Sequence, residues 1–209
     1  MPRLIIVVIS ILLATASHAG QKAITDTGDE VILHSDGTWK FVNNSRKTTE
    51  KITTNQMEFT KPDSSFFLLK STRNTSAFWI NPAKWSFEKA STNAEAEYEF
   101  QLKGQDLYGM VIAEGVQMPV ESLTDIAVTI AKNAVPDIEV TKKEYRYVNG
   151  NKVIYMEMRG TMQGMKVTYL GHYYTDAAGS TQLVAYTGTA LADKYRSEIS
   201  DFLNGLAVQ

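Results

Sequence analysis

Cysteine is absent from the 209-residue chain, and histidine occurs only three times. Without cysteine there can be no disulfide, thiol nucleophile, thiolate zinc site or lipid-modified N-terminal cysteine. The histidines form no H-x-x-x-H pair, and no D-x-D-x-D loop offers oxygen ligands to calcium. No G-x-S-x-G segment places a serine on a strained turn for nucleophilic attack. These absences predict no catalytic residue, no metal and no cofactor.

An excess of basic charge is also missing. The chain holds 21 Lys and Arg against 23 Asp and Glu, a formal net charge of −2, and its basic residues form no polybasic cluster. Nucleic-acid binding needs a basic surface that displaces counterions from phosphates, and anionic membranes attract polybasic segments. We therefore expect neither nucleic acid nor an anionic membrane surface as a partner.

Long hydrophobic runs are limited to one segment at the N-terminus. Arg3 precedes an apolar run over residues 4–16, and small residues follow at Ser17 and Ala19. This is the layout of a secretory signal peptide, and the run is shorter than the roughly 20 apolar residues of a membrane-spanning helix. We expect a signal peptide over residues 1–19, cleaved near Ala19, and a periplasmic or secreted protein without stable membrane insertion. A retained N-terminal anchor is the alternative.

Residues 20–43 are typical of a small β-hairpin module. Short strand-like stretches are separated by turn residues, among them Asp36-Gly37. Asp-Gly between strands favours a hairpin because glycine accepts the positive φ that such turns require. The segment resembles a V-x-L-x-x-D-G-T-W module of exported bacterial proteins. The expected strands span 23–26, 30–34 and 38–42.

A polar linker is predicted next, over residues 44–57. Ile52 is the one apolar side chain between residues 43 and 56. Such a segment buries too little surface to offset the entropy lost on ordering. We expect it to tether the hairpin module to the rest of the chain.

Residues 58–209 are predicted to form one α+β domain. Aromatic-rich strands come first, followed by an amphipathic helix over 119–135 and a meander of four strands. Short hairpins make neighbouring strands antiparallel, and the apolar stripe of a helix must cover a sheet. The expected strands span 66–70, 78–80, 86–90, 97–102, 108–114, 138–148, 152–161, 166–175 and 181–188.

A second amphipathic helix is predicted to close the domain, with Thr189 as its cap. The expected fold class is therefore an antiparallel sheet with flanking helices. The apolar stripe of the closing helix consists of Tyr195, Ile199, Phe202, Leu203 and Leu206.

Two segments of this domain resemble the PsbP-like superfamily. F-W-I-N-P-A-K-W at residues 78–85 is similar to that family's aromatic–Pro–x–x–Trp segment, and V-N-G-N-K-V-I-Y at 148–155 leads into the meander in a similar way. The order of strands, helix, meander and C-terminal helix is similar over residues 60–209. The resemblance implies an α/β/α sandwich and a binding or assembly role rather than an enzymatic activity.

The hairpin around Gln163-Gly164 predicts which side chains of the meander share a face. Its register places Tyr155 opposite His172, and ionisable groups converge on their face of the sheet. This face is a candidate ligand-binding surface, with a half-solvated sheet face as the alternative. The candidate ligand-binding residues are Tyr155, Glu157, Arg159, His172 and Tyr174. The opposite face is predicted to be core and carries Ile154, Met156, Met158, Val167, Tyr169, Gly171 and Tyr173.

Two pairs of residues are candidates for contact with a partner. Met162 and Met165 lie at the tip of the Gln163-Gly164 hairpin, where exposed apolar side chains favour contact. Two thioethers are too few to hold copper, so we expect no copper site. Trp79 and Trp85 flank a rigid Asn-Pro turn that directs both indoles, with burial in the core as the alternative.

These features together predict an exported, non-enzymatic binding or accessory protein. The leading function is protein–protein interaction or assembly, with a protein partner in the extracytoplasmic space. A small-ligand binding protein that uses the second face of the meander is the alternative, and a cryptic hydrolase is the third hypothesis.

Overall fold

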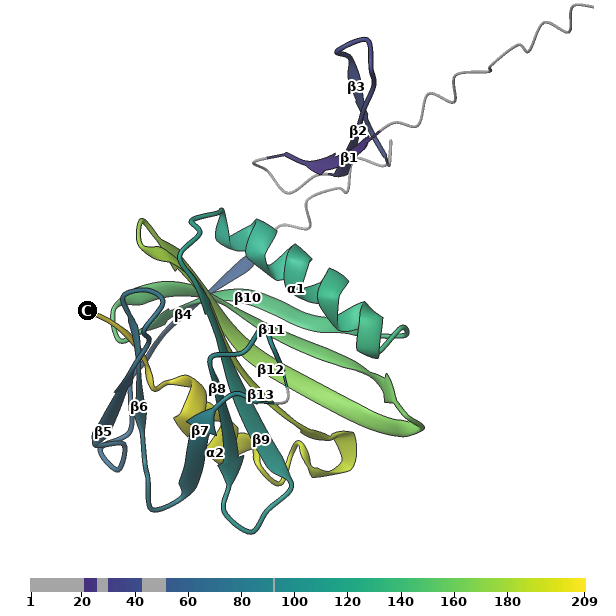
Figure 1. Cartoon of the computed structure of the whole chain (residues 1–209). Coiled ribbons are helices and arrows are strands. Elements are labelled where there is room, and N and C mark those ends of the chain that lie inside the picture. Colours follow the sequence, from purple (N-terminus) through teal and green to yellow (C-terminus); the bar gives the residue numbers. More distant parts are fainter. Residues whose placement is uncertain (1–20, 26–29, 43–51, 92) are drawn as a thin grey trace, which may run out of the picture. The chain divides into compact units, whose positions relative to one another are not determined.

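The structure is a computed structural model of the chain and describes residues 21–25, 30–42, 52–91 and 93–209 (Figure 1). The predicted signal peptide and the first part of the predicted linker lie outside the described residues. The chain divides into two compact units, a small N-terminal one and a main one that includes residues 45–209. Among the described residues, no helix combines the length and the apolar character needed to cross a membrane.

The N-terminal unit is an antiparallel sheet of three strands in the order β1-β2-β3. At the turn between β2 and β3, the Asp36 carboxylate accepts hydrogen bonds from the Thr38 amide (2.9 Å) and hydroxyl (2.6 Å). Gly37 has a φ of +80°. The hairpin predicted at Asp36-Gly37 is confirmed. The strands are β1 (Gln21–Ile24), β2 (Glu30–Leu33) and β3 (Trp39–Phe41).

An eight-stranded sheet forms the centre of the main unit, in the order β4-β10-β11-β12-β13-β9-β8-β7 (Figure 1). All neighbouring strands are antiparallel except β4, which runs parallel to β10. The strands are β4 (Thr53–Phe59), β7 (Trp85–Lys89), β8 (Tyr98–Leu102), β9 (Leu107–Glu114), β10 (Glu139–Val148), β11 (Asn151–Met162), β12 (Met165–Asp176) and β13 (Gly179–Gly188).

Two tight turns set the register of the meander β10 to β12. Asn149-Gly150 and Gln163-Gly164 each place two successive residues at positive φ, between 49° and 82°. Positive φ at both central residues matches the twist of the flanking strands. The resulting register pairs Tyr155 with His172, as the sequence predicted.

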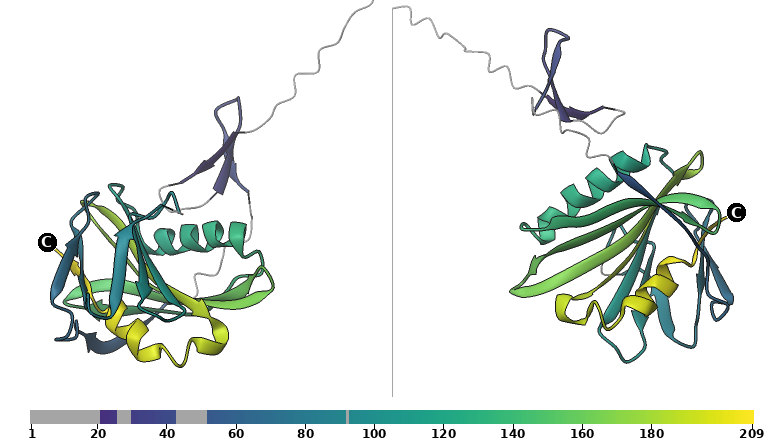
Figure 2. Two further views of the ribbon diagram at one scale, coloured as in Figure 1. Left: turned by 60° about the horizontal axis from the view of Figure 1, so that its bottom comes forward. Right: turned by 180° about the vertical axis from the view of Figure 1, so that it is seen from behind.

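One helix packs on each face of this sheet (Figure 2). α1 (Val120–Ala134) buries Leu123 against the predicted core face of the meander, which includes Met156. α2 (Arg196–Leu203) packs on the other face, where Phe202 joins a cluster with Leu170 and Trp85. Each helix covers the sheet with its apolar stripe because that stripe is the only part of its surface that water does not solvate favourably.

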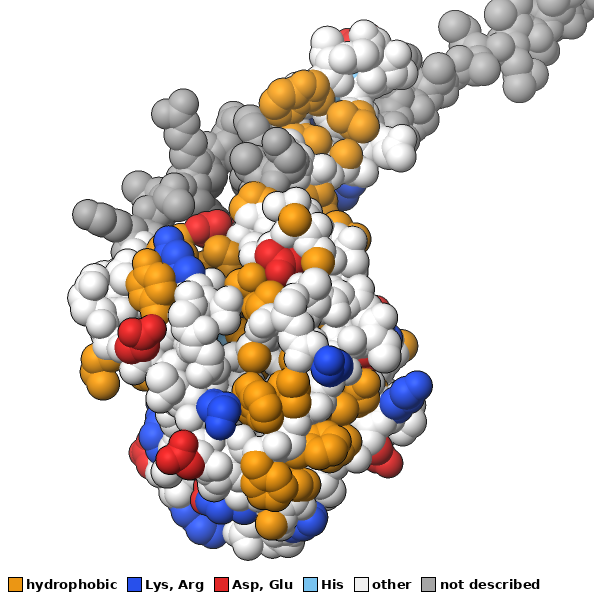
Figure 3. Space-filling model, turned by 90° about the vertical axis from the view of Figure 1, so that its left-hand side faces the viewer, with side chains coloured by type: hydrophobic (Ala, Val, Ile, Leu, Met, Phe, Trp, Pro, Cys, Tyr) orange, Lys and Arg blue, Asp and Glu red, His pale blue; other side chains and the backbone are white. Residues whose placement is uncertain are grey.

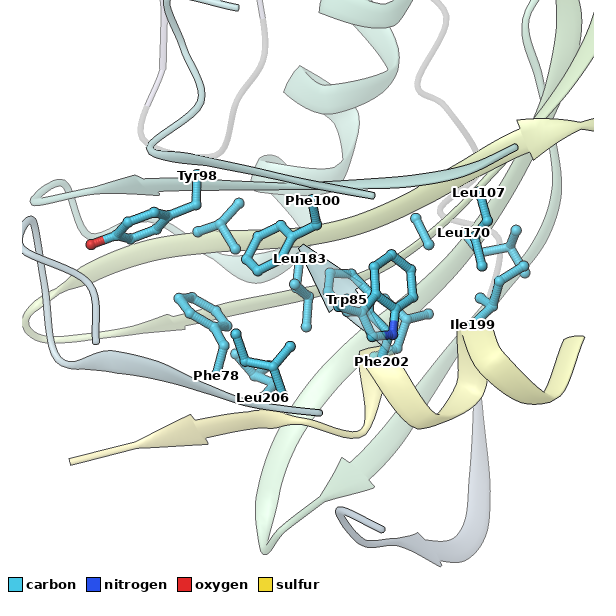
Figure 4. Close-up of a cluster of buried hydrophobic side chains, with 14 of the residues drawn as sticks. Phe78, Trp85, Tyr98, Phe100, Leu107, Leu170, Leu183, Ile199, Phe202 and Leu206 are labelled. Atoms are coloured by element: carbon cyan, nitrogen blue, oxygen red, sulfur yellow. The ribbon is translucent and has the colours of Figure 1, made fainter. Parts of the chain in front are cut away.

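A second, three-stranded sheet covers the same face as α2, in the antiparallel order β14-β6-β5. Phe78 of β6 and Leu206 of β14 point into the cluster that contains Phe202 (Figure 4). The main unit is therefore an α+β fold in which strands dominate. The strands of this sheet are β5 (Phe67–Lys70), β6 (Ser76–Ile80) and β14 (Leu206–Val208).

The closing helix is shorter than the sequence predicted. α2 ends at Leu203, and Leu206 lies in β14, paired with Phe78. The chain turns at Gly205, where a Cβ would lie 2.2 Å from the Trp79 carbonyl oxygen. Leu206 is buried in the strand as it would be in a helix, so the apolar stripe did not distinguish the two conformations.

The predicted cap at Thr189 is also wrong. Thr189–Leu191 forms a short 3-10 turn, and α2 begins at Arg196 with Tyr195 at its N-cap. The Thr189 hydroxyl lies 3.0 Å from the Thr168 hydroxyl instead. Threonine hydroxyls hydrogen-bond in turns as readily as at caps, so the residue type alone did not fix the start of the helix.

The polar linker predicted over residues 44–57 is wrong in its last part. Thr53 to Met57 lie in β4, which pairs with β10 through Glu144↔Thr53 and Tyr145↔Thr54. Backbone hydrogen bonds to a neighbouring strand order this segment although its side chains are largely polar and exposed. Composition does not report such a partner.

Phe202 is the residue whose loss we expect to weaken the main unit most. Its ring stacks on Trp85 with 4.5 Å between centroids and meets Phe100 edge-on at 5.1 Å (Figure 4). Phe202→Ala should lower the free energy of unfolding by about 4 kcal/mol in urea titrations, because it removes a buried ring and leaves a cavity. Val116→Ala, at an exposed position, should change it by less than about 0.5 kcal/mol. Equal effects of the two variants would contradict this packing.

Candidate functional site

The residues predicted to bind a ligand lie on one face of the meander, and three of them are buried. Tyr155, Glu157 and His172 are 4%, 8% and 0% exposed. α2 covers them, because Arg196 reaches Glu157 and the Leu203 carbonyl reaches His172. This part of the face is therefore neither half-solvated nor an open pocket.

Glu157 is the centre of the buried cluster. Its Oε1 accepts hydrogen bonds from the Tyr155 hydroxyl at 2.5 Å and from Arg196 Nη1 at 2.6 Å. Arg159 Nη2 lies 4.0 Å from Oε2, and its side chain is half exposed. A buried carboxylate needs such partners because desolvation disfavours its charge. Burial, together with the Glu157 carboxylate, raises the pKa of Tyr155, so its hydroxyl stays a hydrogen-bond donor.

Arg146 and Glu144 of β10, which were not among the residues predicted from the sequence, extend the cluster. Arg146 Nε donates to Glu144 Oε1 at 2.7 Å, and its guanidinium lies 3.4 Å from the centre of the Tyr155 ring. Burial favours the protonated form of Glu144, but hydrogen bonds from Arg146 and Asn55 outweigh it and lower the pKa. Glu144 pairs with Tyr155 across the Asn149-Gly150 hairpin. Pairing that hairpin from the sequence would have placed Glu144 on this face.

His172 has the environment of a packed core side chain. Its Nδ1 lies 3.0 Å from the Leu203 carbonyl oxygen, and its ring meets Tyr155 edge-on at 5.8 Å. Nε2 has no hydrogen-bond partner among the described residues. Complete burial lowers the pKa of His172 to about 3, and the charge of Arg146 adds to this shift. The ring is neutral at physiological pH and shielded from solvent, which suits packing rather than proton transfer to a substrate.

Tyr174 belongs to a different cluster, near the turn between β12 and β13. Its hydroxyl donates to Asp176 Oδ2 at 3.2 Å, and Thr75 Oγ1 lies 3.0 Å from the same oxygen. Asp176 Oδ1 accepts the amides of Ala178 and Gly179 at 2.8 and 3.2 Å. Asp176 therefore fixes the turn, and Tyr174 supports it. The structure brings Tyr155, Glu157 and His172 together and leaves Tyr174 apart.

The two tryptophans proposed for partner contact differ in their surroundings. Trp85 is 3% exposed and stacks on Phe202, so it is a core residue and its expected role in contact is wrong. Its aromatic neighbours on β8 and α2 could not be read from the local Asn-Pro turn. Trp79 is half-buried, and the Lys61 ammonium lies 5.0 Å from its ring centre. A shallow hollow beside these indoles has a free volume of about 10 Å³, roughly the space of one water molecule.

Met162 and Met165 close the β11–β12 hairpin opposite each other. Met165 is 63% exposed, as expected for a tip residue. Met162 is half-buried, and its sulfur lies 3.8 Å from the Tyr169 hydroxyl. One methionine of the pair is thus available for contact, and the other packs on the sheet.

An exposed aromatic pair at the start of β5 was not singled out from the sequence. Phe66 and Phe67 are 66% and 41% exposed. The ring centres of Phe67 and Phe87 lie 5.5 Å apart, and those of Phe87 and the buried Phe100 lie 6.2 Å apart. Figure 3 shows hydrophobic side chains gathered on the side of the main unit that carries β5 and β6. The signal in the sequence was the apolar run F-F-L-L before Lys70, which lacks the alternation of a half-buried strand.

Solved structures of other proteins share the fold of the main unit. No protein-family model matches the chain, and no curated protein matches it. Cyanobacterial PsbP (CyanoP) from Synechocystis aligns with a TM-score of 0.54 and 16% sequence identity, over 71% of this chain and 95% of that chain. The main unit has a PsbP-like fold, as the resemblance at residues 78–85 and 148–155 implied.

Two further structures are similar at lower scores. A protein of unknown function from Pseudomonas aeruginosa has a TM-score of 0.44 and 10% identity, covering 68% of this chain and 96% of that chain. LpqN, involved in cell envelope biogenesis of Mycobacterium tuberculosis, has a TM-score of 0.38 and 10% identity, covering 72% and 82%. At these scores the likeness does not bear on function.

Burial of His172 predicts that acid weakens the fold. A histidine in the unfolded chain titrates near pH 6.5, whereas burial holds the pKa of His172 at about 3. Between these values the unfolded chain binds the additional proton. The free energy of unfolding therefore falls as the pH is lowered, by up to about 1.4 kcal/mol per pH unit. His172→Gln should reduce this slope between about pH 6 and pH 4 in urea titrations. An unchanged slope would show that His172 is not buried in its neutral form.

The Glu157–Arg196 pair predicts a second stability effect. Arg196→Gln should lower the free energy of unfolding by about 2 kcal/mol, because the buried Glu157 then keeps only the more distant Arg159 as a cation. This figure is below that of a fully buried pair because the Arg196 side chain is 41% exposed. Lys84→Gln breaks the more exposed Lys84–Glu198 pair and should cost less than about 1 kcal/mol.

A double variant tests whether the Glu157–Arg196 effect comes from the pair itself. Adding Glu157→Gln to Arg196→Gln removes the buried charge, so it should recover part of the stability that Arg196→Gln loses. Additive losses in the double variant would contradict a direct interaction between the two side chains.

Proposed function

We propose that this chain is an exported accessory protein that acts by binding another protein outside the cytoplasm. The PsbP-like fold of the main unit supplies the frame, which we infer to be the α/β/α sandwich that the sequence suggested. The predicted signal peptide over residues 1–19 supports the location. A protein partner agrees with the near balance of acidic and basic residues, since neither nucleic acid nor an anionic membrane would be attracted to it.

The observation that carries the proposal is the aromatic pair Phe66 and Phe67. Large aromatic side chains with this exposure are uncommon on a surface that meets only water, and aromatic residues are enriched at protein interfaces. Phe67 packs against Phe87, which is half-buried. A partner that covers this pair gains apolar burial without rearranging the domain.

The polar groups on the second face of the meander favour contact over small-ligand binding. The Tyr155 hydroxyl and Arg196 Nη1 donate to Glu157, Arg196 Nη2 donates to Asp193, and His172 is completely buried under α2. A ligand pocket needs converging polar groups that are free to bind. Met165 at the hairpin tip is a second exposed apolar side chain that a partner could cover.

Affinity capture with the mature chain, beginning at Gly20, tests this function. The immobilised chain should enrich a partner from an extracytoplasmic fraction, and Phe66→Ser combined with Phe67→Ser should reduce the recovery about tenfold, because aromatic anchors carry most interface energy. The matched control is Val116→Ser combined with Ile130→Ser, which replaces two exposed apolar residues elsewhere. Recovery is measured by quantitative mass spectrometry.

Two results would count against the proposal. In the first, the wild-type chain enriches nothing beyond what the Phe66/Phe67 variant enriches. In the second, the control variant loses as much of the partner as the Phe66/Phe67 variant does. A clear rise in the midpoint of thermal unfolding with a metabolite would instead support the small-ligand hypothesis, since a ligand of the folded state stabilises it.

A further inference from the structure

The free edge of β5 has a defined pattern of backbone groups. β5 is the outer strand of the sheet β14-β6-β5, and its register pairs Leu69 with Phe78. The Ser71 amide donates to the Ser76 carbonyl at 2.9 Å, so Ser71 and Ser76 form a hydrogen-bonded pair of the ladder. In an antiparallel ladder such pairs alternate along the strand. Leu69 and Phe67 therefore also bond to β6, whereas Leu68 and Lys70 direct their amides and carbonyls away from it.

The same alternation is visible on the neighbouring strand. Trp79, which faces Leu68 across the ladder, donates its amide to the Gly205 carbonyl at 2.8 Å, on the side away from β5. On β5 the outward carbonyl of Lys70 accepts the Tyr98 hydroxyl at 3.2 Å. No hydrogen bond among the described residues reaches the amide or carbonyl of Leu68 or the amide of Lys70. These three groups can receive a further strand.

The side chains along this edge define what such a strand must carry. Phe67 and Leu69 face the core side of the sheet, where Phe67 meets Phe87. Phe66 and Leu68 lie on the opposite side because side chains alternate along a strand. Apolar residues placed opposite Phe67 and Leu69 would extend the row of aromatic contacts that runs from Phe67 through Phe87 to the buried Phe100.

Two lysines mark one end of the edge. Lys70 ends β5, and Lys89 ends β7 in register with Tyr98, whose hydroxyl reaches the Lys70 carbonyl. Both lysines are exposed, and neither forms an ion pair with another described residue. The nearby carboxylate of Glu97 is buried and accepts hydrogen bonds from Thr72 and Ser71. An acidic side chain on the incoming strand is therefore favoured at this end.

We propose that β5 receives an extended segment of the partner protein as a fourth strand, antiparallel to β5. The segment has apolar residues opposite Leu69 and Phe67 and an acidic residue opposite Lys70, on the N-terminal side of the apolar ones. The residue between the two apolar ones lies opposite Leu68 and exchanges two backbone hydrogen bonds with it. This inference deepens the proposed function and rests on it, since it names the site and the chemical class of the partner segment.

The charge at Lys70 favours a foreign segment over a second copy of this chain. If two β5 strands paired antiparallel around Leu68, each Lys70 would face the Phe66 of the other copy, and no acidic side chain would meet it. Concentration-dependent dimerisation that Lys70→Glu leaves intact is therefore an outcome that would overturn the proposal.

A short peptide probe tests the site on the whole mature chain. The probe is acetyl-Asp-Val-Thr-Val-Thr-amide, whose Asp is placed opposite Lys70 and whose first Thr is placed opposite Leu68. In an NMR titration, the amides of Leu68 and Lys70 should shift. Methylation of the backbone nitrogen of that Thr should weaken binding about tenfold, because it removes the donor to the Leu68 carbonyl. This second probe tests the site on unaltered protein.

Variants of the protein at Leu68 and Lys70 test the same contacts as the peptide variants. Leu68→Pro removes an outward amide that the fold does not use, and proline is tolerated on edge strands, so binding should fall about tenfold with the domain still folded. Leu68→Val is the matched control because it keeps the amide, and it should bind nearly as well as wild type. Lys70→Glu should weaken the Asp probe about threefold and favour a probe that begins with Lys.

The outcomes separate this inference from the proposed function. Binding that is absent, or that is equally strong with the N-methyl probe and with Leu68→Pro, would overturn the strand addition at β5. A partner captured equally well by wild type and by Leu68→Pro would leave the accessory function standing and reject β5 as its site. Loss of both the probe and the captured partner in Leu68→Pro, with retention in Leu68→Val, is the result that we expect.

Discussion

The docking of α2 on the large sheet is the interaction on which the rest of the main unit depends. Phe202 reaches the sheet backbone at Gly109, where a Cβ would lie 2.8 Å from its ring, and it stacks on Trp85. The helix that carries this ring also supplies Arg196 to the buried Glu157. α2 thereby supplies apolar burial and charge compensation on the same face of the sheet. A helix of eight residues holds little intrinsic stability, so these tertiary contacts must keep it in place.

Local rules predicted most of the strands and the long helix. The Asn149-Gly150 and Gln163-Gly164 turns set the meander, and α1 followed from one continuous apolar stripe that ends before Pro136. The errors share a different origin. β4 is ordered by a parallel partner some 90 residues away in the chain, for example Thr53 beside Glu144, and Leu206 is placed by β6. Such non-local pairing leaves no periodic signal in the segment itself.

The same limit applies to the candidate site. The hairpin register correctly placed Tyr155 opposite His172, because a pairing rule relates two segments joined by a tight turn. It did not reveal that α2 would cover them, or that Trp85 would turn into the core against Phe202. A sheet face can be read from sequence, whereas the element that lies over it depends on the whole fold. The converging polar residues were therefore found, and their burial was not.

The four outer strands of the two sheets of the main unit differ in how they are protected from further pairing. β4 is largely polar, β7 carries Glu88 and Lys89, and β14 has only three residues. Short, polar or charged edges resist the addition of a foreign strand. β5 has four residues and is apolar up to Lys70, and two phenylalanines are exposed at its start. An apolar edge left in water invites aggregation. Its presence in a chain that protects its other edges is best explained if β5 is covered while the protein is at work.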